Sequence, residues 1–283
     1  MGDQHIADLL ITEAAVFDVF TGELRQQPLA VKAGRIAVTG ACPAKETLAL
    51  PGKIILPGFC DGHIHLESSQ LTVPEFAAAA VLHGTTAVVA DPHEIANVCG
   101  LDGPRYLLRT APYDLLDLFL MAPSCVPATP FETAGASLTA DDIREMLSWP
   151  QVLGLGEMMN FPGVLAEDPQ VLEKLRAAAG RPIDGHAPGL TGEPLRRYLA
   201  AGPNSDHECT TLVEGQEKVA AGMWVMLREG SGSRNLAALA PILCADQKHR
   251  CLLVSDDLEA RDLLERGHLD HLLREAVKLG VAP

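Results

Sequence analysis

The sequence has few aromatic residues and an excess of acidic over basic ones. Aromatic residues make up 4% of the 283 residues, so aliphatic side chains must fill most of the core. Lys and Arg total 22 against 37 Asp and Glu, which gives a formal charge of −15. This balance disfavours nucleic-acid binding through phosphate neutralisation and binding to an anionic membrane surface.

Several familiar motifs are also absent. The seven cysteines are scattered and form no Cys-x-x-Cys pair, which argues against a disulfide framework and a thiolate zinc site. No G-x-G-x-x-G or G-x-x-x-x-G-K-[ST] sequence marks a nucleotide-phosphate fold. Apolar runs are far too short to span a bilayer, and the first residues carry acids where a secretory signal would carry Lys or Arg. We therefore predict a cytoplasmic protein.

The chain changes character near Pro51. Residues 1–52 contain short β-type runs joined by turns and predict a small β segment. Beyond them, strand-like runs alternate with helical spacing, which predicts an α/β (β/α)₈ TIM-like barrel over residues 53–283, with an open doubly wound sheet as the alternative. The expected strands are 54–59, 85–90, 115–122, 152–156, 181–184, 204–206, 223–227 and 251–254. The expected helices are 74–83, 140–149, 169–180, 194–201, 215–221, 233–243 and 258–278.

Histidines and carboxylates follow the expected strands, where the functional groups of such barrels gather. His63 and His65 are two residues apart, so on an extended chain both imidazoles face the same side and can reach one metal ion. The alternative is a pair of polar loop residues. Four further candidate ligands follow later strands: Glu157, His186, His207 and Asp256. Six such ligands exceed the need of one tetrahedral zinc, and a carboxylate between two histidine sets predicts a two-metal site.

These ligands and their order resemble the layout of the amidohydrolase superfamily. Longer stretches are similar to the adenine deaminase family, and DPHEIANV and GEMMN are specific to it rather than to the superfamily. The resemblance covers nearly the whole chain. The stretches that carry it are 56–100, 154–164, 184–190, 205–211, 227–236 and 253–258.

The resemblance implies a purine-salvage enzyme that converts adenine and water to hypoxanthine and ammonia. It implies a binuclear Mn²⁺ or Fe²⁺ centre, with Zn²⁺ as the alternative, on a metal-dependent barrel. By matching, His63, His65 and Asp256 hold one metal, His186 and His207 hold the other, and Glu157 bridges them. Asp256 is the first candidate for the proton shuttle, and Glu94 and Glu208 are the alternatives.

Other polar residues are candidates for substrate contacts. His93, which follows the second expected strand, is expected to bind the purine or, with Glu94, a further metal. Glu67 is expected to contact the substrate, with a helix-start acid as the alternative. Arg228 and Ser231 are expected in the pocket wall, and a structural ion pair is the alternative for Arg228. His268 is expected to be solvated.

The chain is shorter than the family leads one to expect. The family's usual chain is about twice this length and has a further C-terminal domain that completes the small β domain. Three hypotheses follow: an adenine deaminase, another amidohydrolase acting on a cyclic amide or amidine, and an inactive metal-binding fragment. A small-molecule purine substrate is the expected partner, and a homodimer is also expected.

Overall fold

A computed structural model of the protein describes residues 6–245 and 249–282, so the acidic start at residues 1–5 lies outside the described part. The chain divides into two compact units, Met1–Gly58 and Phe59–Pro283. The division falls after Gly58 rather than after residue 52, because β7 (Ile54–Ile55) pairs in parallel with β2 (Ala15–Asp18). Each unit is described by itself.

The first unit consists of two small sheets. One has the order β5-β4-β1-β6 and the other β3-β2-β7. Ala33 and Gly34 both have positive φ and form the tight turn between β4 and β5. Ala7, Leu10 and Ala30 form the buried core of the first sheet. The other strands of this unit are β1 (Ala7–Thr12), β3 (Glu23–Gln26), β4 (Leu29–Lys32), β5 (Arg35–Thr39) and β6 (Ala44–Ala49).

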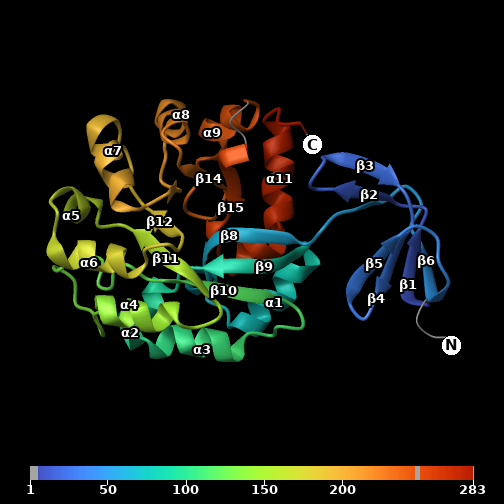
Figure 1. The fold of residues 1–283 in the computed structure, drawn as a ribbon, viewed down its shortest axis with the longest axis horizontal. Coiled ribbons are helices and arrows are strands. Elements are labelled where there is room, and N and C mark those ends of the chain that lie inside the picture. Colours follow the sequence, from blue (N-terminus) through green and yellow to red (C-terminus); the bar gives the residue numbers. More distant parts are fainter. Residues whose placement is uncertain (1–5, 246–248, 283) are drawn as a thin grey trace. The chain divides into compact units, whose positions relative to one another are not determined.

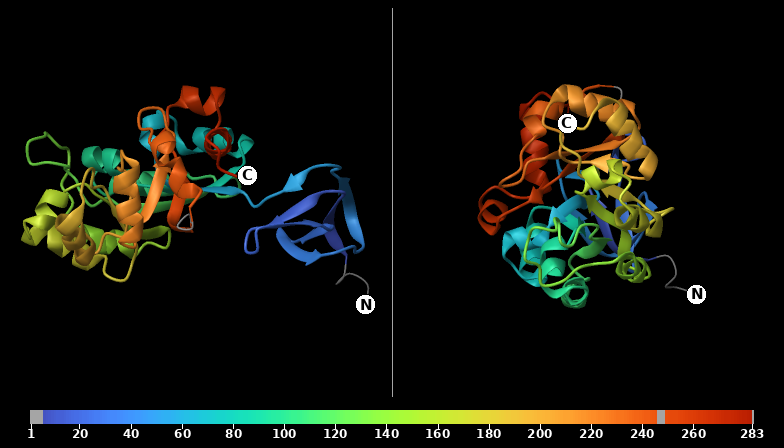
Figure 2. Two further views of the ribbon diagram at one scale, coloured as in Figure 1. Left: turned by 90° about the horizontal axis from the view of Figure 1, so that it is seen from above. Right: turned by 90° about the vertical axis from the view of Figure 1, so that its left-hand side faces the viewer.

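The second unit is built on parallel strands. They form a six-stranded sheet of order β12-β11-β10-β9-β8-β16 and a three-stranded sheet of order β13-β14-β15. A hydrogen bond from Asn204 N to Ile183 O, 3.0 Å long, links β12 to the start of β13. The strands are β8 (Phe59–His65), β9 (Thr85–Ala90), β10 (Asp117–Ala122), β11 (Val152–Met158), β12 (Ile183–Gly185), β13 (Ser205–Asp206), β14 (Trp224–Arg228), β15 (Cys251–Val254) and β16 (Asp256–Asp257). Figures 1 and 2 show a curled parallel sheet with helices outside it, which is consistent with a TIM-like barrel.

The predicted first strand, 54–59, is wrong. Ile54 and Ile55 belong to the small β unit, and the first strand of the parallel sheet begins at Phe59. Pro57 lacks a backbone N–H and, with Gly58, interrupts the apolar run between them. The His63–His65 pair therefore lies within β8, at its C-terminal end, rather than beyond it.

The helices connect successive strands. The expected helix 258–278 is two helices, because Gly267 adopts a φ of 114° between them. Between β9 and β10 lie two helices that the spacing did not predict, α2 and α3. The helices are α1 (Val73–Leu82), α2 (His93–Cys99), α3 (Asp102–Thr110), α4 (Ala140–Leu147), α5 (Phe161–Leu165), α6 (Pro169–Ala177), α7 (Gly192–Ala201), α8 (Leu212–Ala220), α9 (Leu236–Leu243), α10 (Ala260–Glu265) and α11 (Leu269–Lys278), with the 3₁₀ turn η1 (Leu66–Ser69).

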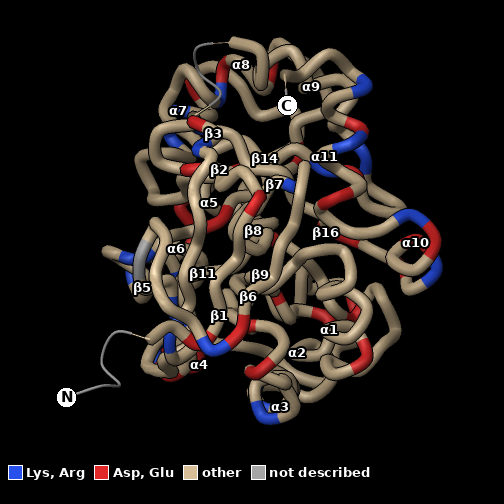
Figure 3. The backbone as a smooth tube through the Cα atoms, turned by 90° about the vertical axis from the view of Figure 1, so that its right-hand side faces the viewer, with Lys and Arg blue, Asp and Glu red and all other residues tan. Residues whose placement is uncertain are grey.

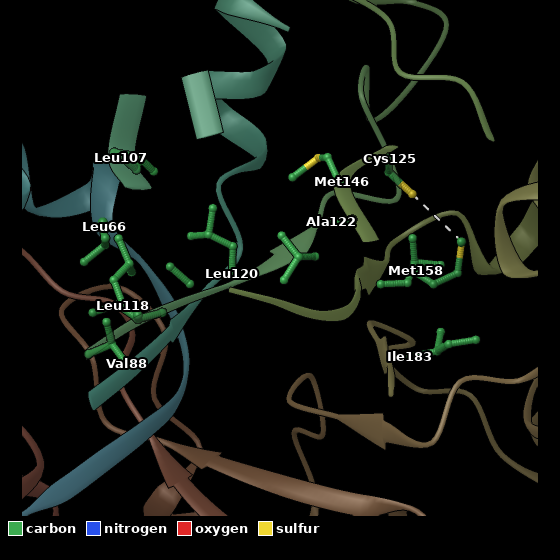
Figure 4. Packing of buried hydrophobic residues seen from close by; sticks show 14 of the residues in the cluster. Leu66, Val88, Leu107, Leu118, Leu120, Ala122, Cys125, Met146, Met158 and Ile183 are labelled. Atoms are coloured by element: carbon green, nitrogen blue, oxygen red, sulfur yellow. Dashed lines mark hydrogen bonds between the residues drawn. The ribbon is translucent and has the colours of Figure 1, made fainter. Parts of the chain in front are cut away.

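Aliphatic residues form the main core between the sheet and its helices. Leu118, Leu120 and Ala122 alternate along β10 and are all buried. Figure 4 shows them among neighbours from β9, β11 and the helices, with Cys125 Sγ 3.9 Å from Met158 Sδ. A core of this composition agrees with the low aromatic content.

The charged residues are distributed along the chain. Figure 3 shows acidic and basic positions interspersed along the backbone of each unit, without a long run of basic positions. Within the described ranges, the helices are too short or too polar to cross a bilayer.

Candidate metal centre

Three of the predicted ligands meet at the C-terminal end of β8 and the first residue of β16. His63 and His65 are buried, and their Nε2 atoms lie 3.3 Å and 3.2 Å from Asp256 Oδ1. The Nδ1 atoms point away, toward Asp184 Oδ2 at 2.9 Å and the Asp91 carbonyl oxygen at 3.0 Å. Such contacts favour the Nδ1–H tautomer, which leaves both Nε2 atoms able to bind a cation.

Glu157, at the end of β11, lies between two histidine sets. Its Oε2 is 2.6 Å from His186 Nδ1 and 2.9 Å from His207 Nε2. Its Oε1 is 3.5 Å from His65 Nε2. The two oxygens of one buried carboxylate thus face different imidazoles, which is the arrangement that a bridging ligand requires.

The donor set fits metal ions. Three groups of three residues that include Glu157 have ligand atoms within 4.8 Å of one another: one with His63 and His65, one with His186 and His207, and one with Asp91 and His93. In the described residues, His63 Nε2 and His207 Nδ1 are buried without a hydrogen-bond partner. Buried unpartnered imidazole nitrogens are costly unless a ligand satisfies them.

The electrostatics of the cluster also favour cations. Burial opposes protonation of His65, but the hydrogen bond to Asp256 and the charge of Glu157 outweigh it and raise its pKa to about 10. Burial would raise the pKa of Glu157, yet hydrogen bonds from His186 and His207 bring it well below the usual range. The carboxylates are therefore ionised, and they attract positive charge, either as protons on the imidazoles or as a metal ion that replaces those protons.

His93 and Glu94 lie in the first turn of α2, beside the same carboxylate. His93 Nδ1 is 3.2 Å from Glu157 Oε1 and 3.8 Å from Asp91 Oδ1. Burial lowers the pKa of His93, but Asp91 and Glu157 outweigh it and raise it to about 9. Asp91 Oδ2 also accepts a hydrogen bond from Glu157 N at 2.8 Å. Asp91 and His93, which follow β9, the second expected strand, therefore lie in the same cluster.

A cavity of about 270 Å³ opens on this cluster. Most of the predicted site residues line this cavity. Met159, Ser233 and Asp257 also line it, although we did not predict them as site residues. The lining residues are His65, His93, Glu94, Glu157, Met159, His186, His207, Glu208, Ser233, Asp256 and Asp257.

Three residues expected to contact the substrate lie outside that lining. Arg228 Nη1 donates to Asp256 Oδ2 at 2.6 Å and to Glu208 Oε1, so it joins two carboxylates. Glu67 Oε1 accepts from Ile95 N at 3.2 Å, and burial together with Glu94 raises the pKa of Glu67 to about 7.

Ser231 is the third of these residues. Its Oγ accepts from Glu259 N at 2.9 Å, and its own N–H donates to Asp257 O at 2.7 Å. Ser233, two residues later, lines the cavity instead.

Some residues that shape the site were missed or misjudged. His268 is wholly buried rather than solvated, with Nε2 2.9 Å from Asp61 Oδ2. Asp61 also accepts from Ser255 Oγ at 2.6 Å, and Ser255 precedes Asp256. Tyr198 of α7 accepts from His186 N at 3.2 Å. The only local signal was the repeated Asp-Gly-His, at 61–63 and 184–186.

Comparisons with known proteins indicate the family of the chain. The model of the amidohydrolase family matches residues 54–273. An adenine deaminase of Desulfatibacillum aliphaticivorans is 47% identical over 278 residues, which are 98% of this chain and 49% of that protein. An adenine deaminase of Nitratidesulfovibrio vulgaris (strain DP4) is 50% identical, over 98% of this chain and 48% of that protein. The chain thus spans about half the length of these relatives.

Solved structures are similar in fold. An N-acetyl-D-glucosamine-6-phosphate deacetylase from Mycobacterium smegmatis superposes with a TM-score of 0.65 at 21% identity, covering 97% of this chain and 84% of that one. A dihydroorotase superposes with a TM-score of 0.59 at 16% identity, covering 96% and 84%. At these identities the likeness concerns the fold alone.

Proposed function

The chain belongs to the amidohydrolase family, and we propose that it carries the catalytic site of an adenine deaminase, which converts adenine and water to hypoxanthine and ammonia. The observation that carries the proposal is the position of Glu157 between His65 on one side and His186 and His207 on the other. Adenine deaminases with 47% and 50% sequence identity over 98% of the chain support the choice of substrate. We further propose that the parallel strands form a (β/α)₈ barrel, with the unit Met1–Gly58 as part of a separate small β domain.

The donor set suggests which residues would hold a binuclear centre. His63, His65 and Asp256 would bind one cation, His186 and His207 the other, and Glu157 would touch both. Mn²⁺ or Fe²⁺, with Zn²⁺ as the alternative, would supply Lewis acidity and lower the pKa of water toward neutrality. Imidazole and carboxylate ligands suit all three ions.

The residues around the cavity suit proton transfer. Asp256 would accept a proton from the attacking water and return it to the leaving amine. Arg228 holds Asp256 Oδ2, which fixes its orientation and leaves Oδ1 toward the histidines. Glu94 and Glu208 remain alternatives, since both line the cavity and Glu94 Oε2 is buried without a hydrogen-bond partner in the described residues.

The cavity suits a compact neutral substrate. Its volume of about 270 Å³ lies just below the range of pockets for drug-sized ligands. His93, which lines the cavity, would contact the purine directly. Glu67 would act through its hydrogen bond with Ile95, which holds the start of α2. Arg228 would hold Asp256, and Ser231 would hold the segment 255–259. A cytoplasmic location and a homodimer stay predictions.

The experiment is turnover by the 283-residue chain after loading with Mn²⁺, or with Fe²⁺ without oxygen. Loss of adenine and gain of hypoxanthine are followed by ultraviolet absorbance. Turnover that chelator abolishes, and that His65→Ala lacks, supports the proposal. Two bound cations without turnover would favour another cyclic amide or amidine as substrate, or an inactive fragment. A chain that binds no metal would overturn the proposed centre.

A further inference from the structure

A lysine lies wholly buried behind the second histidine pair. Lys218 is on α8, and its Nζ donates to Ala187 O at 2.7 Å and to Glu214 Oε1 at 2.7 Å. Asp206 Oδ1 lies 3.3 Å from the same nitrogen. An ammonium has three protons, so these three acceptors satisfy it completely. Burial lowers its pKa, but Asp206 and Glu214 outweigh burial and raise it, which keeps the side chain charged.

The carboxylate of Asp206 also binds backbone N–H groups next to both histidines. Asp206 Oδ2 accepts from Ala187 N at 2.8 Å, and its Oδ1 accepts from Glu208 N at 2.8 Å. Ala187 directly follows His186, and Asp206 and Glu208 flank His207. The side chain of Asp206 therefore joins the two segments that carry these histidines.

Glu214 extends the connection along both segments. Its Oε1 accepts from Gly189 N at 2.8 Å and its Oε2 from Thr210 N at 3.2 Å. Three ionic side chains thus fix the turns after β12 and β13. These hydrogen bonds join residues between positions 187 and 218, whereas His63 and His65 belong to β8.

Buried ions are a poor way to stabilise a fold. Removing such charges from water costs free energy that their mutual attraction barely recovers, and apolar residues of similar volume often serve as well. The pattern of hydrogen bonds suggests a different use. We infer that Asp206, Glu214 and Lys218 are positioning residues that hold His186 and His207 in the geometry for binding a cation. This rests on the proposed function, since it concerns the second of the two proposed metal sites.

The experiment measures Mn²⁺ binding to the 283-residue chain by equilibrium dialysis and metal analysis. Lys218→Met should weaken one of the two binding steps about tenfold or more and leave the other within about twofold, as for residues that orient metal ligands. Glu214→Gln keeps the side-chain volume and one acceptor oxygen, so we expect an intermediate loss. It also tests the inference if Lys218→Met does not fold.

Ile143→Ala is the control, because Ile143 is a buried core residue of α4. It should lower thermal stability and leave both binding steps unchanged. If the control and the two variants all weaken both Mn²⁺-binding steps equally, the inference is overturned. It is also overturned if Lys218→Met and Glu214→Gln leave both binding steps unchanged. A wild-type chain that binds no Mn²⁺ would instead overturn the proposed metal centre itself, and the inference with it.

Discussion

Tyr198→Phe removes a single oxygen from the fully buried side chain of Tyr198. The hydroxyl donates to Met158 O at 3.0 Å and accepts from His186 N at 3.2 Å, so it joins the ends of β11 and β12. Phenylalanine leaves one buried carbonyl and one buried N–H without a partner, at about 1–3 kcal/mol each. Taking about 3 kcal/mol in total, we expect Tm to fall by about 6–12 °C for a unit of the size of Phe59–Pro283.

The assay is thermal unfolding followed by circular dichroism, with Mn²⁺ binding measured in parallel. Since His186 loses a backbone contact, one Mn²⁺ site should also weaken about tenfold. Tyr113→Phe is the matched control: Tyr113 is 43% exposed and its hydroxyl donates to Leu108 O at 3.3 Å, so its Tm should barely change. If Tyr198→Phe unfolds within about 2 °C of wild type, the two hydrogen bonds do not contribute this stability.

Three further changes test other parts of the site. In Gly156→Ala the new Cβ would overlap Asp91 Oδ2, which binds Glu157 N, so metal analysis should show weakened loading. Asp256→Asn should reduce adenine turnover by orders of magnitude while part of the metal stays bound; wild-type turnover would refute the assignment. Burial raises the pKa of Asp270, but hydrogen bonds from Arg274 and a backbone N–H outweigh it and lower the pKa below 3.8. Its stabilisation is therefore present above about pH 4 and lost on further acidification, and Asp270→Asn should flatten that part of a Tm-against-pH curve.

The ligand positions could be predicted because strand ends converge. The i, i+2 spacing of His63 and His65 placed both on one side of an extended segment, and the structure has them within 3.3 Å of the same Asp256 oxygen. Glu157 and His186 followed apolar runs that proved to be neighbouring strands, β11 and β12. In each case a local pattern sufficed, since the fold brings the C-terminal ends of parallel strands together.

Long-range partners could not be predicted in the same way. Ile54 and Ile55 looked like the start of a buried strand, but pairing with β2 assigns them to the small β unit. Glu214 and Lys218 have the i, i+4 spacing of an exposed helical ion pair, yet both are buried. His268 contacts Asp61, which lies 207 positions earlier in the sequence. No local pattern encodes these contacts.

The repeated Asp-Gly-His shows where local information ends. In the first copy, Asp61 binds Ser255 and His268 and thereby holds the strand that leads to Asp256. In the second copy, Asp184 lies 2.9 Å from Nδ1 of His63, the histidine of the first copy. The same three residues therefore orient different ligands, because the neighbouring strand decides what each aspartate can reach. Replacing either aspartate by asparagine should consequently weaken the metal-binding step that involves His63 and Asp256, although only Asp61 lies close to His63 in sequence, two residues before it.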